Sequence, residues 1–308
     1  MISLRYHAVS IAAVFLALAV GVVLGTRTQT DGLLPGIGEG GAQAEDLRAE
    51  NARLAEQLRA SDAFLAGAAP KLLGGALANR GVVVFTTPDA ELSDVDSVTK
   101  ALTTAGATVS GQVALTNAFT DSTEGDRLRT ALANLVPAGA QLGTGATDQG
   151  SLGGDVLGLL LLTDPANGAP RGSDQERGLA LETLRGGGFL NPVGEVRPGN
   201  LAVVVTGDGV RADENQRGTI IARFAGGLKA RGAGVVLAGR QGAAEGSGPI
   251  SVAREEAPLA TVTTVDNVDR EIGRMTTALG LTEQLSGGTG RYGTGAKATS
   301  LTVAAMPR

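Results

Sequence analysis

The sequence predicts an α/β protein that begins with a single transmembrane helix and a coiled-coil stalk and continues as a largely parallel sheet with helices on both faces. Three observations lead to this fold class. An uncharged apolar run fills residues 8–25, leucines recur at heptad spacing over residues 44–69, and short valine-rich runs alternate with helical patterns from residue 80 onward. Strands that alternate with helices favour a parallel sheet covered on both faces.

Residues 80–308 are expected to form one α/β domain with a glycine-rich C-terminal tail. Five strands are predicted where short apolar runs end in turn residues, at 80–90, 107–116, 200–208, 233–240 and 259–267. Helices are predicted where apolar residues recur with helical period, at 92–105, 125–135, 151–164, 173–185, 214–232 and 268–285. The tail, residues 286–303, is expected to be a loop that ends in a strand.

Residues 1–27 are expected to be a retained signal-anchor, with a cleaved signal peptide as the alternative. Arg5 precedes the apolar run, and Ala17-Leu18-Ala19 resembles a cleavage site. In a cleaved signal the apolar run stops at such a site, but here it continues through Leu24. The 20 residues from His7 to Thr26 are long enough as a helix to cross a hydrocarbon core of about 30 Å.

The orientation of this span is inferred from the charges beside it. The N-terminal amino group and Arg5 precede the span, and the positive-inside tendency then favours a cytoplasmic N-terminus. The expected protein is therefore single-pass in the cell membrane, with the lipid bilayer as a partner and the C-terminal domain outside the cytoplasm. An outer envelope layer stays open as its final location.

The predicted membrane helix carries a face of small residues. Residues four apart share one face of a helix, and small side chains there let two helices approach closely. The alternative is that glycine and alanine are simply common in membrane helices. We expect this face to be a transmembrane dimer contact, formed by Ala13, Ala17, Gly21 and Gly25.

Residues 28–43 are glycine-rich and predict a flexible tether, and residues 44–69 predict a coiled-coil stalk. The heptad register places leucines at its core positions, Leu47 and Leu54 at d with Leu58 and Leu65 at a. Asn51 occupies a further a position, where a buried amide selects a parallel two-stranded coil. The prediction is a parallel homodimer; the alternative is an amphipathic helix that packs on its own domain and ends at Pro70.

Composition argues against several classes of function. The net charge of −5 offers no basic field for a nucleic acid. Cysteine is absent, which excludes disulfides and thiolate sites, and the single histidine, His7, precedes the apolar run. No pair of carboxylates stands out for acid–base catalysis. We therefore expect no enzyme activity and no cofactor, and we assign no catalytic, cofactor-binding or metal-binding residue.

Two glycine-rich segments resemble phosphate-binding loops in composition but not in spacing. In the tail, Lys297 lies between two alanines, so the GxxxxGK[ST] pattern is absent. The segment VTGDGVRADE at 205–214 follows a strand but lacks G-x-G-x-x-G spacing, which favours a plain βα loop. Nearby polar residues are expected to cap helices, Ser93 or Asp94 in one case and Asp213 in another.

Motifs along the whole chain resemble the actinobacterial copper transporter family. The most specific are MISLRYHAVSIAAVFLALAVGVVLG at the N-terminus and TVDNVDREIGRMTTALGLTEQLSGGTGRYGTG near the C-terminus, with LVPAGAQL, TDQGSLGGDVLG and ARFAGGLKARGAGVVLAGR between them. The chain departs from the family at 28–43, where glycine replaces a more continuously helical segment. The resemblance implies an envelope protein of copper homeostasis, proposed to export copper through a channel. It also implies envelope-assembly or cell-division proteins as partners.

The side chains offer limited chemistry for copper itself. Cu(I) prefers cysteine and methionine ligands, then imidazole. This chain has no cysteine, one histidine, His7, and three methionines, Met1, Met275 and Met306. Met275 is expected to be a core residue of the last helix. The apolar span has only Ser10 as a polar side chain to line a pore. Copper is thus a transported ion only by resemblance, while composition alone favours a non-enzymatic dimeric scaffold for cell-wall assembly or division.

Overall fold

The computed structural model describes residues 39–304, with side chains from residue 43 onward. The chain divides into two compact units, residues 1–59 and 60–308. The predicted anchor, with the small-residue face from Ala13 to Gly25, lies outside the described residues. Within residues 39–304 no helix combines the length and the apolar character that a bilayer crossing requires.

The first described element is the long helix α2, Glu39–Leu73. It starts inside the segment predicted as a tether and continues past Pro70, so both predicted boundaries of the stalk differ from the structure. Pro70 is tolerated because it lies in the last turn, which the fully buried Leu73 holds against the core.

Seven strands form one sheet in the order β3-β2-β1-β4-β5-β6-β7. Every neighbouring pair is parallel except β2 and β3, which confirms the predicted, largely parallel sheet. The strands are β1 Gly81–Thr86, β2 Thr108–Leu115, β3 Leu190–Val193, β4 Leu201–Val205, β5 Gly234–Ala238, β6 Thr263–Val265 and β7 Arg291–Tyr292. Sequence analysis missed β3 because Asn191 and Pro192 are poor strand formers; an edge strand accommodates proline.

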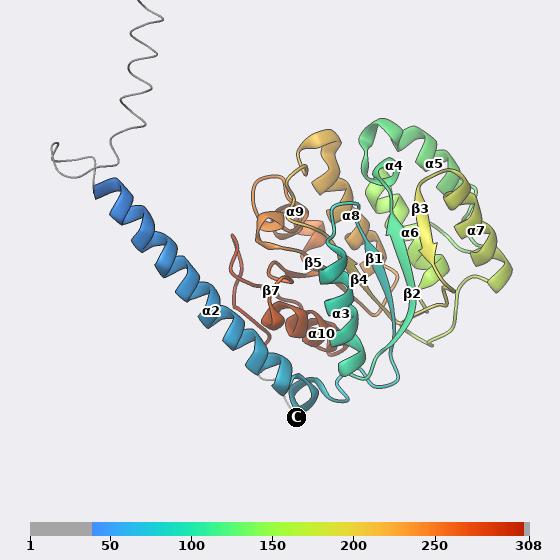
Figure 1. The fold of residues 1–308 in the computed structure, drawn as a ribbon. Helices are drawn as coiled ribbons and strands as arrows, with labels where there is room; N and C mark the ends of the chain where they lie inside the picture. Colours follow the sequence, from blue (N-terminus) through green and yellow to red (C-terminus); the bar gives the residue numbers. More distant parts are fainter. Residues whose placement is uncertain (1–38, 305–308) are drawn as a thin grey trace, which may run out of the picture. The chain divides into compact units, whose positions relative to one another are not determined.

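Helices cover both faces of the sheet, as predicted (Figure 1). They are α3 Leu92–Thr104, α4 Asn117–Thr120, α5 Gly125–Ala133, α6 Gln149–Leu161, α7 Asp174–Gly186, α8 Arg217–Lys229, α9 Pro249–Glu255 and α10 Glu271–Leu285. Short 3-10 turns span Ser122–Glu124, Glu214–Gln216, Gln241–Ala244 and Ala257–Leu259. The short helix α9 was not predicted.

The sheet separates two hydrophobic cores. On β1, Val83 and Phe85 face the core formed with α5 to α9, whereas Val82 and Val84 face the core formed with α3 and α10. Burial of both faces explains why the strands are continuous valine runs without polar alternation. Met275 of α10 is 3% exposed and belongs to the second core, as expected from the sequence.

Helix α6 is buried along almost its whole length and packs closely on α8. A Cβ atom added at Gly154 would lie 2.1 Å from the carbonyl oxygen of Phe224 on α8. The glycines of α6 therefore let two helix backbones approach more closely than any side chain would permit. This contact gives the segment SLGGDVLG a structural role.

The glycine-rich tail is held by a fully buried ion pair. The Arg254 guanidinium donates to Asp266 Oδ2 over 2.7 Å, and both side chains are 0% exposed. It also donates to the carbonyl oxygens of Tyr292 and Ala296, while Asp266 accepts from the backbone N–H of Thr294. Gly293 has φ +125°, and a Cβ there would lie 2.0 Å from Asp266 Oδ1. The tail glycines thus allow the backbone to pack closely against this ion pair, which gives them a role other than phosphate binding.

Candidate functional site

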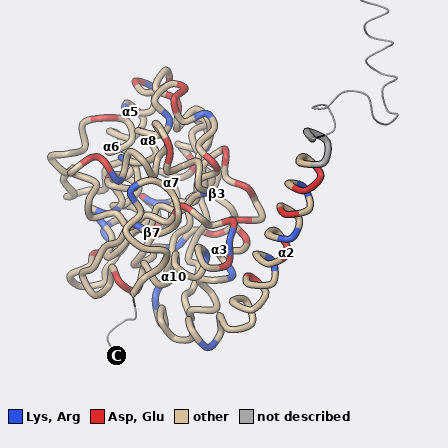
Figure 2. The backbone as a smooth tube through the Cα atoms, turned by 90° about the vertical axis from the view of Figure 1, so that its left-hand side faces the viewer, with Lys and Arg blue, Asp and Glu red and all other residues tan. Residues whose placement is uncertain are grey.

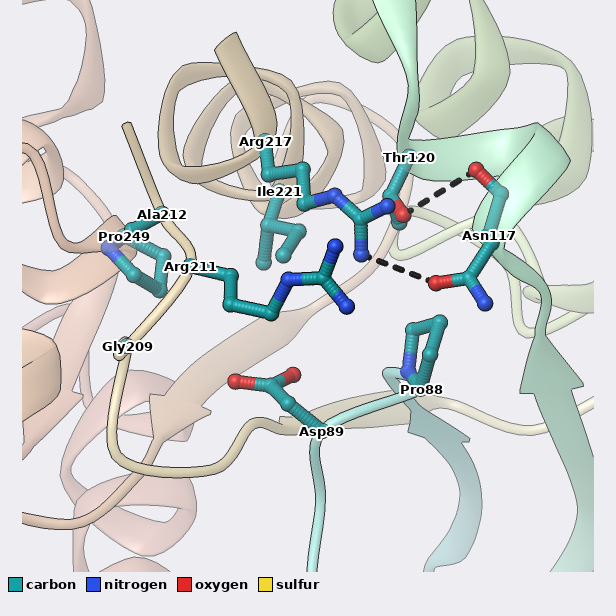
Figure 3. Close-up of a pocket in the computed structure, with 10 residues that line it drawn as sticks. All are labelled: Pro88, Asp89, Asn117, Thr120, Gly209, Arg211, Ala212, Arg217, Ile221 and Pro249. Carbon is teal, nitrogen blue, oxygen red and sulfur yellow. Dashed lines mark hydrogen bonds between the residues drawn. The ribbon is translucent and has the colours of Figure 1, made fainter. Parts of the chain in front are cut away.

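A cavity of about 240 Å³ lies at the carboxyl ends of β1, β2 and β4. The strand order reverses here, because β1 lies between β2 and β4 and the chain returns to β4 only after β3. In open α/β sheets such a switch point leaves a crevice where ligands bind. The cavity is lined by Pro88 and Asp89 after β1, Asn117 and Thr120 after β2, Gly209, Arg211 and Ala212 after β4, Arg217 and Ile221 of α8, and Pro249 of α9 (Figure 3).

Arg217, the first residue of α8, has a positioned but under-used guanidinium group. Its side chain is only 15% exposed, and its Nη1 donates to Asn117 Oδ1 over 2.8 Å. Its Nη2 lies 3.9 Å from Asp121 Oδ2, beyond hydrogen-bond distance, and its Nε is buried without a partner among the described residues. A guanidinium carries five N–H donors, so most of this group's hydrogen-bonding capacity is unused.

Arg211 brings a second guanidinium to the cavity. Its side chain is 65% exposed and pairs with Glu214, which raises the pKa of Arg211 and lowers that of Glu214. Figure 3 shows the guanidinium groups of Arg211 and Arg217 directed into the same space. Two cationic donors therefore converge, one from the loop after β4 and one from the start of α8.

Asp89 supplies the acidic wall of the cavity (Figure 3). Its Oδ1 accepts a short hydrogen bond from the Thr87 hydroxyl and a longer one, 3.5 Å, from the Thr206 hydroxyl. Its Oδ2 accepts no hydrogen bond from any described residue. The carboxylate is thus oriented by β1 and β4 and keeps one oxygen for another donor.

The loop before α8 holds two consecutive non-glycine residues in the left-handed region, Asn215 at φ 49° and Gln216 at φ 61°. Each such residue costs about 1–3 kcal/mol and persists only where its surroundings enforce it. Here Asn215 Nδ2 donates to Asp121 Oδ2 over 2.8 Å and ties the loop to the segment after β2. The pKa of Asp121 is lowered mainly by hydrogen bonds from Thr123 and to a smaller extent by the one from Asn215, which favours the charged carboxylate.

The residues assigned from the sequence lie elsewhere. In the first unit Leu47, Leu54 and Leu58 of α2 are 64%, 43% and 50% exposed, and Asn51 is also exposed. Leu65, in the second unit, is partly buried against the core that contains α3 and α10. The coiled-coil pairing of the stalk residues stays a prediction.

No motif in the sequence predicts this cavity. The segment 205–214, predicted as a plain βα loop, contributes part of the cavity wall. Asp94 does not cap α3; it is buried and accepts from Arg240 Nε over 2.7 Å. Asp213 occupies the N-cap position of the 3-10 turn Glu214–Gln216 but makes no capping hydrogen bond with its side chain, and Gln216 precedes α8. The sequence signal for this site is a polar residue shortly after a buried strand, since Asp89 follows the end of β1 after Thr87 and Pro88.

The described residues offer no evident copper site. Residues 39–304 contain no group of three or more histidine, cysteine, aspartate or glutamate side chains placed to hold a metal ion. Met275, the methionine expected within the last helix, is enclosed by apolar neighbours. Charged residues of both signs intermingle along the described backbone (Figure 2).

Comparison with known proteins places these features in a family. Residues 1–303 match the family described as "Copper transport outer membrane protein, MctB". The chain belongs to this family. It is 43% identical to "Copper transporter MctB" of Mycobacterium leprae (strain TN) over 328 residues, which cover 98% of this chain and 99% of the relative. It is 40% identical over 312 residues to the protein of that name from Mycobacterium tuberculosis (strain H37Rv), with the same coverage. The resemblance stated from the sequence motifs is therefore confirmed.

Proposed function

We propose that this chain is a single-pass, non-enzymatic protein of the cell envelope that takes part in copper export and copper homeostasis. The observation that carries the proposal is the 40–43% identity, over 98% of the chain, to proteins named copper transporters. The family description adds an envelope location. The apolar run at residues 8–25 supports an anchor, with the α/β unit outside the cytoplasm.

Copper enters this proposal as cargo. Cu(I) is held best by thiolate and thioether ligands, and the chain has no cysteine and three methionines, one of them buried in α10. Tight coordination by the α/β unit of one copy is therefore disfavoured. We propose that copper passage depends on several copies together, or on an indirect effect on envelope permeability.

A parallel homodimer is part of the proposal. The leucines at 47, 54 and 58 recur at heptad spacing and are at least 43% exposed, so they present apolar surface that a second α2 helix would cover. This exposed leucine row also favours a second candidate function, a dimeric scaffold that presents the α/β units to proteins of cell-wall assembly or division.

The deciding experiment is a deletion strain in which intracellular copper and cell shape are measured together. Copper export predicts that the strain accumulates copper and that the wild-type gene restores the normal level. Purified protein in planar bilayers should also conduct copper if export is direct. Normal copper with a division or cell-wall defect would reject the export proposal and support the scaffold.

A complementation pair tests the role of the leucine row. Leu54→Ser alters a predicted core position, and Ala52→Ser makes a matched change at an exposed position outside the row. We expect Leu54→Ser to lose complementation and Ala52→Ser to retain it. Full complementation by Leu54→Ser would show that the row is not needed for function.

A further inference from the structure

We propose that the cavity at the switch point binds a small phosphorylated polyol, with the phosphate on Arg217 and Arg211 and a hydroxyl group on Asp89. This inference concerns a small-molecule ligand and does not depend on the copper proposal. It rests on the location of the cavity, the unused hydrogen-bonding capacity around it and the order of its loop.

The location comes from the sheet. The segments after β1, β2 and β4 all border the cavity, and α3 and α8 leave the sheet on opposite faces beside it. This arrangement opens a crevice by topology alone. Its volume of about 240 Å³ is below the 300–1,000 Å³ of pockets for drug-sized ligands, so the occupant is small.

The donors point to an anion with several oxygens. Arg217 makes one hydrogen bond among the described residues although its side chain is only 15% exposed. A mostly buried guanidinium with unused donors is costly unless an acceptor arrives. Arg211 is directed into the same space (Figure 3). A tetrahedral phosphate has enough oxygens to accept from both groups at once.

The acids around the cavity explain why a polyol is expected beside the phosphate. Asp121 is occupied by Thr123 and Asn215, and Glu214 is occupied by Arg211. Asp89 Oδ2 is the carboxylate oxygen on the cavity wall that no described residue engages. As an acceptor it matches a ligand hydroxyl and would repel a second anionic group.

The loop that carries Arg211 and leads to Arg217 at the start of α8 is held before any ligand arrives. Asn215 and Gln216 are fixed in left-handed conformations, and the Asn215–Asp121 hydrogen bond ties this part of the loop to the segment after β2. A ligand would therefore bind without first ordering this loop. Preorganisation of this kind lowers the entropic cost of binding.

The test is isothermal titration calorimetry on the full-length chain in detergent, with glycerol 3-phosphate as the probe and glycerol and inorganic phosphate as comparisons. We expect saturable binding of glycerol 3-phosphate, none of glycerol, and at least threefold weaker binding of inorganic phosphate. Arg217→Gln and Arg211→Gln should each weaken glycerol 3-phosphate at least threefold. Asp89→Ala should weaken glycerol 3-phosphate and leave inorganic phosphate unchanged or tighter.

Arg197→Gln is the matched control, because Arg197 is 71% exposed and pairs with Glu195 away from the cavity. It should bind glycerol 3-phosphate as the wild type does. Arg211 is largely exposed, so Arg211→Gln decides the matter if Arg217→Gln fails to fold. Absence of saturable binding up to about 10 mM, equal affinity for inorganic phosphate, or wild-type affinity in Arg211→Gln would overturn the proposal.

Discussion

Replacing Arg254 by methionine is expected to destabilise the α/β unit strongly. The guanidinium is fully buried and makes hydrogen bonds of 2.7 to 3.0 Å to Asp266, Thr264 and the carbonyl oxygens of Tyr292 and Ala296. Methionine keeps much of the apolar volume but removes every donor. The carboxylate of Asp266 then stays buried with only backbone N–H groups of the tail as partners.

The magnitude follows from the burial. Breaking a buried ion pair from one side costs about 3–5 kcal/mol, because the remaining charge is uncompensated. The two tail carbonyls each lose a hydrogen bond worth about 1 kcal/mol, and these terms overlap with the first. We therefore expect a loss of about 4 kcal/mol from a total stability of about 5–15 kcal/mol.

The assay is urea unfolding of the full-length chain, followed by circular dichroism. With a slope of about 3 kcal/mol per molar urea, the midpoint should fall by more than about 1 M. Arg197→Met, at an exposed ion pair with both side chains 71% exposed, should change stability by less than about 1 kcal/mol.

A double-mutant cycle isolates the pair itself. Asp266→Asn removes the opposite charge while keeping an acceptor for the tail N–H groups, so the double variant should lose clearly less than the sum of the single variants. The reasoning is refuted if Arg254→Met unfolds within about 1 kcal/mol of the wild type, or if the two losses simply add.

Three further predictions concern the pH response, the helix packing and the stalk. Hydrogen bonds from the backbone N–H of Ala138, and then from Ser173, lower the pKa of Glu176 from 4.5 to about 2. Because the pKa of Glu176 is lower in the folded state than in the unfolded state, the ionised carboxylate stabilises the fold at pH values above 4.5, and this contribution should fade as the pH falls from 4.5 towards 2. Glu176→Gln should abolish that part of the dependence of stability on pH. An unchanged dependence would contradict the assignment. Gly154→Ala should cost more than about 1 kcal/mol in urea unfolding, because its Cβ would overlap the α8 backbone, whereas Gly178→Ala, at an exposed helical position with open space, should gain about 0.5–1 kcal/mol; equal effects would argue against the close helix contact. Asn51→Leu should change the oligomeric state or register of the stalk in analytical ultracentrifugation, and an unaltered dimer would refute its predicted a position.

The elements that were predicted well are those with strong local patterns. Strand β4 is buried on both faces and α10 on one, so each shows a recognisable pattern of apolar residues within a short stretch of sequence, a valine run in β4 and a helical period in α10. The elements that were not predicted lack such a local apolar pattern. Strand β3 carries Pro192 at a sheet edge, and α9 is only seven residues long. Their structure depends on neighbours that are distant in the chain.

The candidate site illustrates the same limit. Asp89, Asn117 and Arg217 are far apart in the sequence, and none belongs to a motif with diagnostic spacing. They meet because β1 lies between β2 and β4, so three loops end at one edge of the sheet. A motif search inspects one loop at a time, so the loop at 205–214 gives no sign of this convergence by itself.

By itself the sequence determined the α/β class, the positions of most strands and helices, and the family. These properties are written in local periodicity and in ordered motifs, and both survive without knowledge of the fold. Only the tertiary structure decided that the tail glycines surround the Arg254–Asp266 pair and that two arginines and an aspartate share a cavity. The physical reason is that burial, ion pairing and cavity shape depend on which distant segments pack together, and the strand order sets that.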